Sequence, residues 1–412
     1  AARREAARAA QRAAEEEDEA AIAAEEEEER LERRAAKRAA ESVRLQKVYE
    51  RFIASEEGQA AAAYRAALPV IGLRDEVHVA LNMAQVIVVC GETGSGKSTQ
   101  VPQMILDRAL ADGRGGETNI IVTQPRRIAA TSLARRVASE RAEVAGARGA
   151  LTGYQVRLES KRTEATKLLF CTTGIALRMM LSETPLDGIS HVVVDEVHER
   201  DTQTDLLLLL LRELLPTRPN LRVVLMSATV QAETFTKYFG DCEVLNAKGR
   251  TFPVEEYHLE QALELTGHVL LPDSPCRLQE HQQYHRQQYA TAQATGLKGR
   301  SSTTNCGTGA EQFDAPILNP DYSEGRYDGF SKNVHECLKR LNESVVNLDL
   351  IQQLLCHIDD ELCEGAVLVF LPGLRDIQDL LSALSADRRF ADASRWRLLP
   401  LHSSLSPAEQ QA

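Results

Sequence analysis

The stretch CGETGSGKSTQ, at positions 90–100, combines three glycines, one lysine and several hydroxyl side chains directly after the apolar run VIVV. Its spacing fits G-x-x-x-x-G-K-[ST] from Gly91 to Ser98, a pattern in which glycines let the backbone close around phosphate groups. The helix expected next offers the positive end of its dipole to the same anion. The pattern predicts a phosphate-binding loop, and the alternative is a glycine-rich turn that only links a strand to a helix.

The side chains of this loop have separate expected roles. Lys97 would reach the β- and γ-phosphates of a nucleoside triphosphate, and the Ser98 hydroxyl would bind a magnesium ion. The predicted nucleotide-contacting residues of the loop are Gly91, Glu92, Thr93, Gly94, Ser95, Gly96, Lys97, Ser98 and Thr99.

A second motif, VVVDEVHER, places two adjacent carboxylates at the end of another apolar run. Two buried carboxylates are costly unless a cation or solvent offsets their charge. In phosphate-loop ATPases an aspartate at this place holds the magnesium ion, and an adjacent glutamate can deprotonate the attacking water. We assign the first role to Asp195 and the second to Glu196, with a helix N-cap pair as the alternative.

The elements that must position these residues alternate between helical segments and short β-branched runs from residue 64 to about 250. The apolar runs are VIVV (86–89), NIIVT (119–123), LLFC (168–171), HVVVD (191–195) and RVVLMS (222–227). Such alternation is typical of an α/β fold, a parallel sheet with helices on both faces, in which ligands bind at the carboxyl edge of the strands. Both chemical motifs directly follow a run of this kind.

The composition limits what the chain can do. Its 412 residues suffice for two domains with extensions, and the 43% hydrophobic content supports a core. The formal net charge of −12 argues against a protein that binds nucleic acid through an overall positive electrostatic field, so any contact with nucleic acid must be made by a local basic surface.

No apolar run approaches the roughly twenty residues of a membrane span, and no signal peptide is recognisable, so we expect no membrane partner. The eight cysteines without a C-x-x-C pair indicate reduced thiols in the cytosol or nucleus, with Cys90 and Cys171 in the core.

Three segments flank the predicted sheet. Residues 1–60, rich in Ala, Glu and Arg, predict an exposed charged helix that is either a solvated spacer or an arm that docks on a partner. Residues 265–335 are polar and predict a disordered insertion, in which a metal pair at His281 and His285 is the less favoured alternative. Residues 345–412 predict the start of a second αβ domain, with GAVLVFLPG (365–373) before a helix from Leu374 to about Leu384 and roughly two strands in all.

The order GETGSGKST, TQPRR, TTG, DEVHER and SAT resembles the DEAH/RNA-helicase-A group of superfamily 2 helicases over residues 64–405. The resemblance implies a RecA-like domain followed by a second one, the use of ATP with Mg²⁺, and RNA as a single-stranded partner. It also implies that Lys97, Ser98, Asp195 and Glu196 act as assigned above. The coupling residues that it implies are His198, Ser227 and Thr229.

The same resemblance implies further contacts with the base and the RNA. Arg136 would stack on the adenine, although a surface arginine is the plainer interpretation. The RNA contacts would be Arg126, Arg127, Thr173, Gly373 and Ser403. The guanidinium groups and hydroxyls among them suit backbone phosphates and sugars, which position a strand without identifying its sequence. Arg126 has the alternative role of capping a carboxylate in the core.

Further along the chain stand GRTFPVEEYHLEQALELTGHVL, the polar insertion, and then NLDLIQQLL, GAVLVFLPGLRDIQ, DRRF and LHSSL. Within the group these segments look most like the member that acts with the small ribosomal subunit in translation initiation. This implies a cytoplasmic protein, with the subunit and initiation factors as partners; roles in splicing or RNA decay are the alternatives. A nucleotide-gated scaffold with little unwinding stays open, and DNA stays possible as the substrate. A transporter ATPase is disfavoured, because SAT rather than an LSGGQ-like motif accompanies the carboxylates. Because the family's later motifs are missing, we expect this chain alone to bind ATP poorly and to hydrolyse hardly any.

Overall fold

The computed structural model describes residues 29–30, 32–228, 232–240, 242–249, 253–278, 319–402, 404–405 and 409. They form two compact units, divided between Phe252 and Pro253, and each unit is described by itself. The predictions for residues 1–28 and for His281, His285, Thr229 and Ser403 lie outside the described residues.

The first unit is built on one sheet with the strand order β4-β3-β5-β2-β6-β7-β1-β8. All neighbours pair in parallel except β3 and β4, which are antiparallel. The strands are β1 (Val86–Gly91), β2 (Ile120–Gln124), β3 (Thr152–Val156), β4 (Glu159–Lys161), β5 (Leu168–Thr172), β6 (His191–Val194), β7 (Arg222–Ser227) and β8 (Glu243–Ala247). The predicted α/β class is confirmed, and the five apolar runs coincide with β1, β2, β5, β6 and β7.

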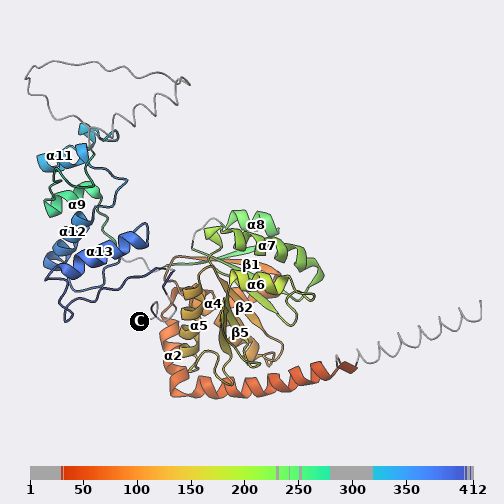
Figure 1. Ribbon diagram of the computed structural model, residues 1–412. Helices are drawn as coiled ribbons and strands as arrows, with labels where there is room; N and C mark the ends of the chain where they lie inside the picture. The colour runs from red at the N-terminus through yellow and green to blue at the C-terminus, as the bar shows by residue number, and fades with distance from the viewer. Residues whose placement is uncertain are drawn as a thin grey trace, which may run out of the picture. The chain divides into compact units, whose positions relative to one another are not determined.

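Helices cover both faces of this sheet (Figure 1). One face packs against α3 (Arg74–Met83), α4 (Lys97–Ala111) and α5 (Arg127–Glu140), and the other against α6 (Thr173–Met180), α7 (Thr202–Leu214) and α8 (Glu233–Phe239). Before α3, the chain forms α2 (Glu56–Ala66) and the 3₁₀ turn η1 (Pro69–Leu73); two further 3₁₀ turns are η2 (Val197–Glu199) and η3 (Leu215–Thr217).

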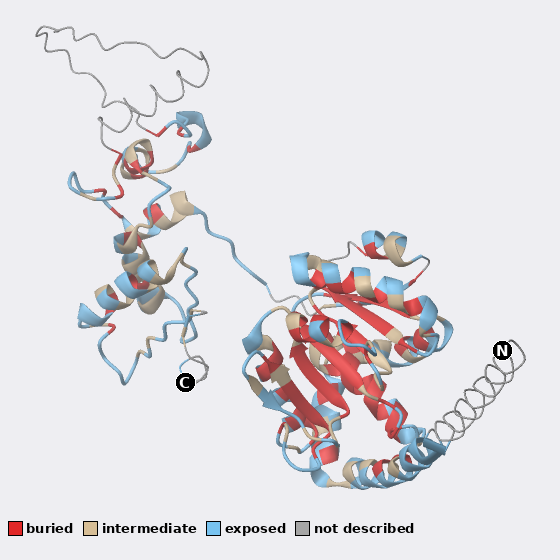
Figure 2. Ribbon diagram, turned by 45° about the vertical axis from the view of Figure 1, so that its right-hand side comes forward, coloured by how far each residue is buried: buried red, intermediate tan, exposed pale blue. Residues whose placement is uncertain are grey.

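Strand side chains alternate between the two cores, as the pleat of a strand requires. In β1, Ile87 and Val89 join the core under α4, whereas Val88 and Cys90 join the core under α7. The central strands are buried on both faces, which Figure 2 shows as continuous red ribbons. Cys90 and Cys171 are 1% and 0% exposed, so their prediction as core residues is confirmed.

The N-terminal helix at residues 32–54 is more than a solvated spacer, because part of it packs on its own domain. Leu45 is only 2% exposed and belongs to the core under α4. The Ser42 hydroxyl accepts a hydrogen bond from the Gly116 amide at 2.9 Å. A Cβ at Gly116 would lie 2.1 Å from the carbonyl oxygen of Arg38, so only glycine permits this close approach. Of the two predictions for this segment, docking on another protein stays untested.

Leu45→Ala removes a buried side chain through which this helix packs on the core of the domain. We expect the free energy of unfolding of the first unit to fall by about 2–5 kcal/mol, because a cavity remains in a packed core. Urea unfolding measures the change. Val43→Ala, on an exposed part of the same helix, is the matched control and is expected to change stability by less than about 0.5 kcal/mol. Equal effects of the two substitutions would show that the helix does not dock in solution.

The second unit is helical in its described residues. Its elements are α9 (Leu259–Thr266), the 3₁₀ turn η4 (Glu324–Arg326), α11 (Lys332–Arg340), α12 (Leu348–Glu361) and α13 (Leu374–Ala386). Leu263, Val334 and Leu350 meet in one small core, and Leu355, Leu380 and Leu384 meet in another.

The predicted boundaries of the disordered insertion, 265 and 335, are wrong, because both include residues that belong to the folded unit. Residues 265–278 and 319–335 are described, and Leu270, Cys276, Tyr322 and Tyr327 are buried with α9 and α11. The polar composition of 265–335 concealed these few apolar residues, which suffice to fold the ends of the segment back on the helices. Residues 279–318 lie outside the described part.

The predicted strands of a second αβ domain are also absent from the described residues of this unit. Residues 365–370 form neither a helix nor a strand, and Leu368 and Phe370 are 74% and 87% exposed. A strand needs a neighbour for its backbone hydrogen bonds, and no described segment pairs with this one. The helix predicted from Leu374 is confirmed as α13. Among the described helices of the whole chain, none is long and apolar enough to cross a bilayer.

Candidate functional site

Three neighbouring strands bring the two chemical motifs together. β7 lies between β6 and β1, and Cys90 of β1 pairs with Ser227 while Val194 of β6 pairs with Leu225. Because the strands are parallel, the loop after β1, the carboxylates after β6 and Ser227 all lie at the same edge of the sheet. This is the carboxyl edge, where α/β folds bind their ligands.

The phosphate loop has the backbone that its glycines predict. Gly94 and Gly96 have φ values of +83° and +89°, in the left-handed region that glycine adopts without strain. A Cβ at Gly96 would lie 3.2 Å from Leu68, and the carbonyl of Ser95 accepts a hydrogen bond from Val70 at 3.1 Å. Leu68 and the 3₁₀ turn η1, which precede α3, therefore pack against the phosphate loop and stabilise its conformation. The helix α4 begins at Lys97.

Two side chains of the loop are buried in a way that fits a triphosphate. Lys97 is 4% exposed, and its charge acts on both Asp195 and Glu196. The Ser95 hydroxyl is fully buried and has no hydrogen-bond partner within the protein. Buried polar groups ordinarily find a partner, so a free hydroxyl and a buried ammonium at a helix N-terminus fit an anionic ligand. The site therefore suits the phosphates of ATP.

Asp195 is the most buried acid of the site, at 1% exposed. Its Oδ2 accepts a hydrogen bond from Gln124 Nε2 at 2.6 Å, and its Oδ1 accepts one from the Glu196 amide at 2.9 Å. Burial raises the pKa of Asp195, while hydrogen bonds from Ser98 and Gln124 and the charge of Lys97 oppose this. A buried carboxylate in contact with the Ser98 hydroxyl is a suitable oxygen pair for Mg²⁺.

Glu196 adopts a conformation that is rare for its residue type, with φ 56° and ψ 36°. Such left-handed backbone costs of order 1–3 kcal/mol and is found mainly where function requires it. Burial and the neighbouring charge of Asp195 raise the pKa of Glu196, which favours a proton-accepting role. Its side chain makes no capping hydrogen bond, and Asp201 caps the following helix α7 instead. Glu196 thus stands at the N-cap position of η2 without a capping hydrogen bond from its side chain, so the N-cap alternative does not account for the pair of carboxylates.

His198 connects the carboxylates to the segment after β7. Its Nδ1 accepts a hydrogen bond from the Ala228 amide at 3.2 Å and lies 3.4 Å from Glu196 Oε2. Ser227, directly before Ala228, is 1% exposed at the end of β7. The arrangement fits the predicted coupling roles of His198 and Ser227, which stay predictions.

The predicted RNA contacts divide into exposed and buried groups. Arg126 and Arg127 follow β2 and are exposed, and Arg126 pairs with Glu199 at 2.9 Å. The Arg126 side chain is 71% exposed, so its alternative role as a cap in the core is wrong. Thr173 is 2% exposed and its hydroxyl donates to the Gln124 carbonyl at 3.5 Å, so it does not face solvent here. Gly373 lies in the second unit as the N-cap residue of α13.

Arg136, the predicted adenine contact, is held on the surface of α5. Its Nε donates to Glu140 Oε1 at 2.8 Å, and its guanidinium carbon lies 4.9 Å from the centre of the Tyr64 ring. The other oxygen of Glu140 accepts hydrogen bonds from Gln100 and Gln103 of α4, at 2.9 and 2.8 Å. The structure thus ties Arg136 to the helix that begins with Lys97.

Several of these contacts were missed from the sequence. Gln124 stands inside the quoted motif TQPRR, but its contact with Asp195 depends on β2 and β6 being neighbours, which strand order alone decides. The spacing of four between Arg136 and Glu140 is a helix pairing that the sequence does show. Tyr64 lies far away in sequence, and no local pattern indicates it.

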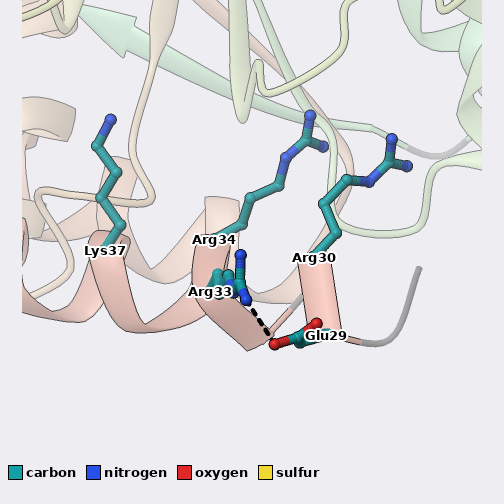
Figure 3. Close-up of a pocket in the computed structure, with 5 residues that line it drawn as sticks. All are labelled: Glu29, Arg30, Arg33, Arg34 and Lys37. Carbon is teal, nitrogen blue, oxygen red and sulfur yellow. Dashed lines mark hydrogen bonds and ion pairs between the residues drawn. The ribbon is translucent and has the colours of Figure 1, made fainter. Parts of the chain in front are cut away.

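A separate surface hollow follows the N-terminal helix (Figure 3). It is lined by Glu29, Arg30, Arg33, Arg34 and Lys37, and Arg33 pairs with Glu29. None of these residues belongs to the predicted site, so the hollow has no part in the nucleotide chemistry described above.

A sequence model of the DEAD/DEAH box helicase family matches residues 74–237. This range contains every predicted nucleotide-contacting and catalytic residue. The chain belongs to the DEAD/DEAH box helicases. The resemblance to the DEAH/RNA-helicase-A group is confirmed by its relatives, which are named RNA helicases.

Three relatives show the extent of this similarity. The chain is 45% identical over 356 residues to the ATP-dependent RNA helicase dhx29 of Xenopus laevis, covering 84% of this chain and 25% of that protein. It is 41% identical over 392 residues to the chloroplastic DExH-box ATP-dependent RNA helicase DExH4 of Arabidopsis thaliana, covering 92% and 26%. It is 37% identical over 371 residues to DExH1 of the same plant, covering 90% and 35%. The chain thus spans about a quarter to a third of the length of these relatives.

Gln124→Leu tests whether the amide positions Asp195 for a metal ion. The substitution keeps the side-chain volume but removes the donor to Oδ2, so we expect the Mg²⁺ concentration for half-maximal nucleotide binding to rise about tenfold or more. A titration of nucleotide binding with Mg²⁺ measures this. Gln155→Leu, on β3, is the control and is expected to behave as the unsubstituted chain. An unchanged Mg²⁺ requirement in Gln124→Leu would rule out this positioning role.

Proposed function

We propose that the chain is the nucleotide-binding part of an ATP-dependent RNA helicase that couples ATP hydrolysis to RNA unwinding or ribonucleoprotein remodelling. The observation that carries the proposal is the convergence of Lys97, Asp195 and Glu196 at one sheet edge, although about a hundred residues separate the lysine from the acids. The names of the relatives support the same activity.

ATP is the source of the phosphoryl group that is transferred to water. The phosphate loop and Lys97 would bind the triphosphate, and Ser98 and Asp195 would hold a Mg²⁺ ion, which would offset charge on the phosphate oxygens. Glu196 accepts a proton from the attacking water, and its raised pKa suits this role. Transition-state charge in this chemistry needs further cations, which the second lobe of a longer protein would supply.

RNA is the proposed macromolecular substrate, bound as a single strand through its backbone. Arg126 and Arg127 are exposed beside the nucleotide motifs, and Arg126 already pairs with Glu199 of the DEVHER segment. If a backbone phosphate of RNA displaced Glu199 from Arg126, RNA binding would change the contacts of the segment that carries Asp195 and Glu196. Gly373 and Ser403 are the proposed contacts of the second lobe.

The narrower role that we propose is in translation initiation on the small ribosomal subunit, in the cytoplasm and with initiation factors as partners. This rests on the sequence resemblance of the second unit and its polar insertion. Stimulation of the ATPase by small ribosomal subunits well beyond that by naked RNA supports the role. Equal stimulation would favour another RNA process, such as splicing or decay.

Substitutions in a protein of the relatives' length test the enzymatic proposal. Lys97→Ala is expected to lower RNA-stimulated phosphate release by about 10²–10³-fold, because a cation on the transferred group is lost. Glu196→Gln is expected to lower it by about 10²–10⁴-fold while ATP binding is kept, because only the proton acceptor is lost. Lys237→Ala and Glu233→Gln, both on the exposed face of α8, are matched controls with unchanged rates.

The rival hypothesis is a scaffold bound to the ribosome or to RNA. Nucleotide binding would open and close this scaffold, but the protein would unwind little RNA. Under this hypothesis Glu196→Gln, which still binds ATP, supports every function of the full protein. Loss of unwinding and of function together in Glu196→Gln favours the enzyme, whereas full function without hydrolysis defeats the helicase proposal.

A further inference from the structure

Tyr64 of α2 and Arg136 of α5 form a contact between segments that are far apart in sequence. The guanidinium carbon lies 4.9 Å from the centre of the tyrosine ring, within the range of a cation–π interaction. Both helices lie beside α4, the helix that follows the phosphate loop (Figure 1). The contact therefore stands next to the element that binds the triphosphate.

A hydrogen bond to Glu140 also fixes the position of the Arg136 guanidinium. Its Nε donates to Glu140, whose carboxylate is only 7% exposed. That carboxylate is fixed in turn by Gln100 and Gln103, and Gln100 also donates to the Thr99 hydroxyl in the first turn of α4. An unbroken series of hydrogen bonds thus runs from the phosphate loop to Arg136.

The helix that carries Tyr64 is itself fixed to α4. Arg65, the next residue, is 7% exposed and donates to Gln100 at 2.7 Å and to Asp107 at 2.9 Å. Asp107 also accepts from Arg141 at 2.6 Å. These buried bonds hold α2, so the position of the Tyr64 ring is set by the same helix that presents the phosphate-binding amides.

One surface of Arg136 stays open. Its side chain is 50% exposed, while its Nε donates to Glu140 and its guanidinium carbon lies over the Tyr64 ring. A planar guanidinium has a second face, and planar cations stack on aromatic rings. In a nucleotide only the ribose separates the base from the phosphates. If the phosphates lie at the start of α4, the base must therefore lie close to that end of the helix.

We propose that Tyr64 is a positioning residue for the base of the bound nucleotide. By covering one face of Arg136, it holds the guanidinium plane so that the opposite face stacks on a purine. The inference rests on the proposed nucleotide site and adds α2 to it. It also explains why a tyrosine that is 52% exposed packs over an arginine that is already ion-paired.

The test compares a ligand that has a base with one that has none. Dissociation constants of ATP and of inorganic tripolyphosphate, both with Mg²⁺, are measured by calorimetry for a protein of the relatives' length and for its variants, because this chain alone is expected to bind ATP poorly. Tyr64→Ala is expected to weaken ATP binding about twofold to fivefold, the size of an exposed cation–π contact, and to leave tripolyphosphate binding unchanged. Tyr64→Phe keeps the ring and is expected to bind both ligands as the unsubstituted chain does. Tyr257→Ala, an exposed tyrosine of the second unit, is the control.

Three results would overturn the inference. Unchanged ATP affinity in Tyr64→Ala would show that the ring does not act on the base. Tighter ATP binding would show that Tyr64 occupies the place of the base rather than supporting it. Equal weakening of ATP and tripolyphosphate would show that the substitution acts on the phosphate loop, and urea unfolding of Tyr64→Ala would then reveal a purely structural effect.

Failure of this inference is distinguishable from failure of the proposed function. If Lys97→Ala abolishes binding of both ligands while Tyr64→Ala changes neither, only the role of Tyr64 is wrong. If the unsubstituted protein of the relatives' length binds neither ligand, or if Lys97→Ala has no effect in it, the nucleotide site is wrong and the role of Tyr64 fails with it.

Discussion

The burial of the Asp195 carboxylate at the end of β6 is the constraint on which the rest of the site depends. An isolated charge at 1% exposure is strongly unfavourable, and three neutral donors and one nearby lysine only partly offset this. The arrangement is a stable one when a divalent cation stands beside the carboxylate. The fold therefore has a local electrostatic cost that a bound divalent cation would offset, because such a cation is often the largest local charge in its site.

The same constraint explains the neighbouring strain and contacts. Glu196 enters the left-handed region because the chain turns sharply once Asp195 has reached the sheet edge. The turn places His198 between Glu196 and Ala228, and Glu199 against Arg126. Changes at the carboxylates thus reach two other motifs through direct contacts, without any need for a long pathway. In the proposed function, these contacts are the route by which a bound nucleotide would be coupled to RNA within one domain.

The sequence allowed the parallel sheet and the phosphate loop to be predicted, because both leave local patterns. VIVV before a glycine-rich loop identifies β1 and α4, and the run before Asp195 identifies β6. The sequence did not reveal that Gln124 contacts Asp195 or that Tyr64 lies over Arg136, since both depend on which elements become neighbours. The second unit was predicted least well: the few apolar residues around Tyr322 fold a polar segment, while the apolar residues at 365–370 find no partner strand among the described residues.

The most direct test of the central claim is a crystal structure of the chain with Mg²⁺ and a non-hydrolysable ATP analogue. The account predicts that Lys97 and the amides of the phosphate loop contact the β- and γ-phosphates. It also predicts that the metal ion is bound by the Ser98 hydroxyl and lies next to the Asp195 carboxylate. A nucleotide bound elsewhere, or a metal ion held without either of these two residues, would contradict it.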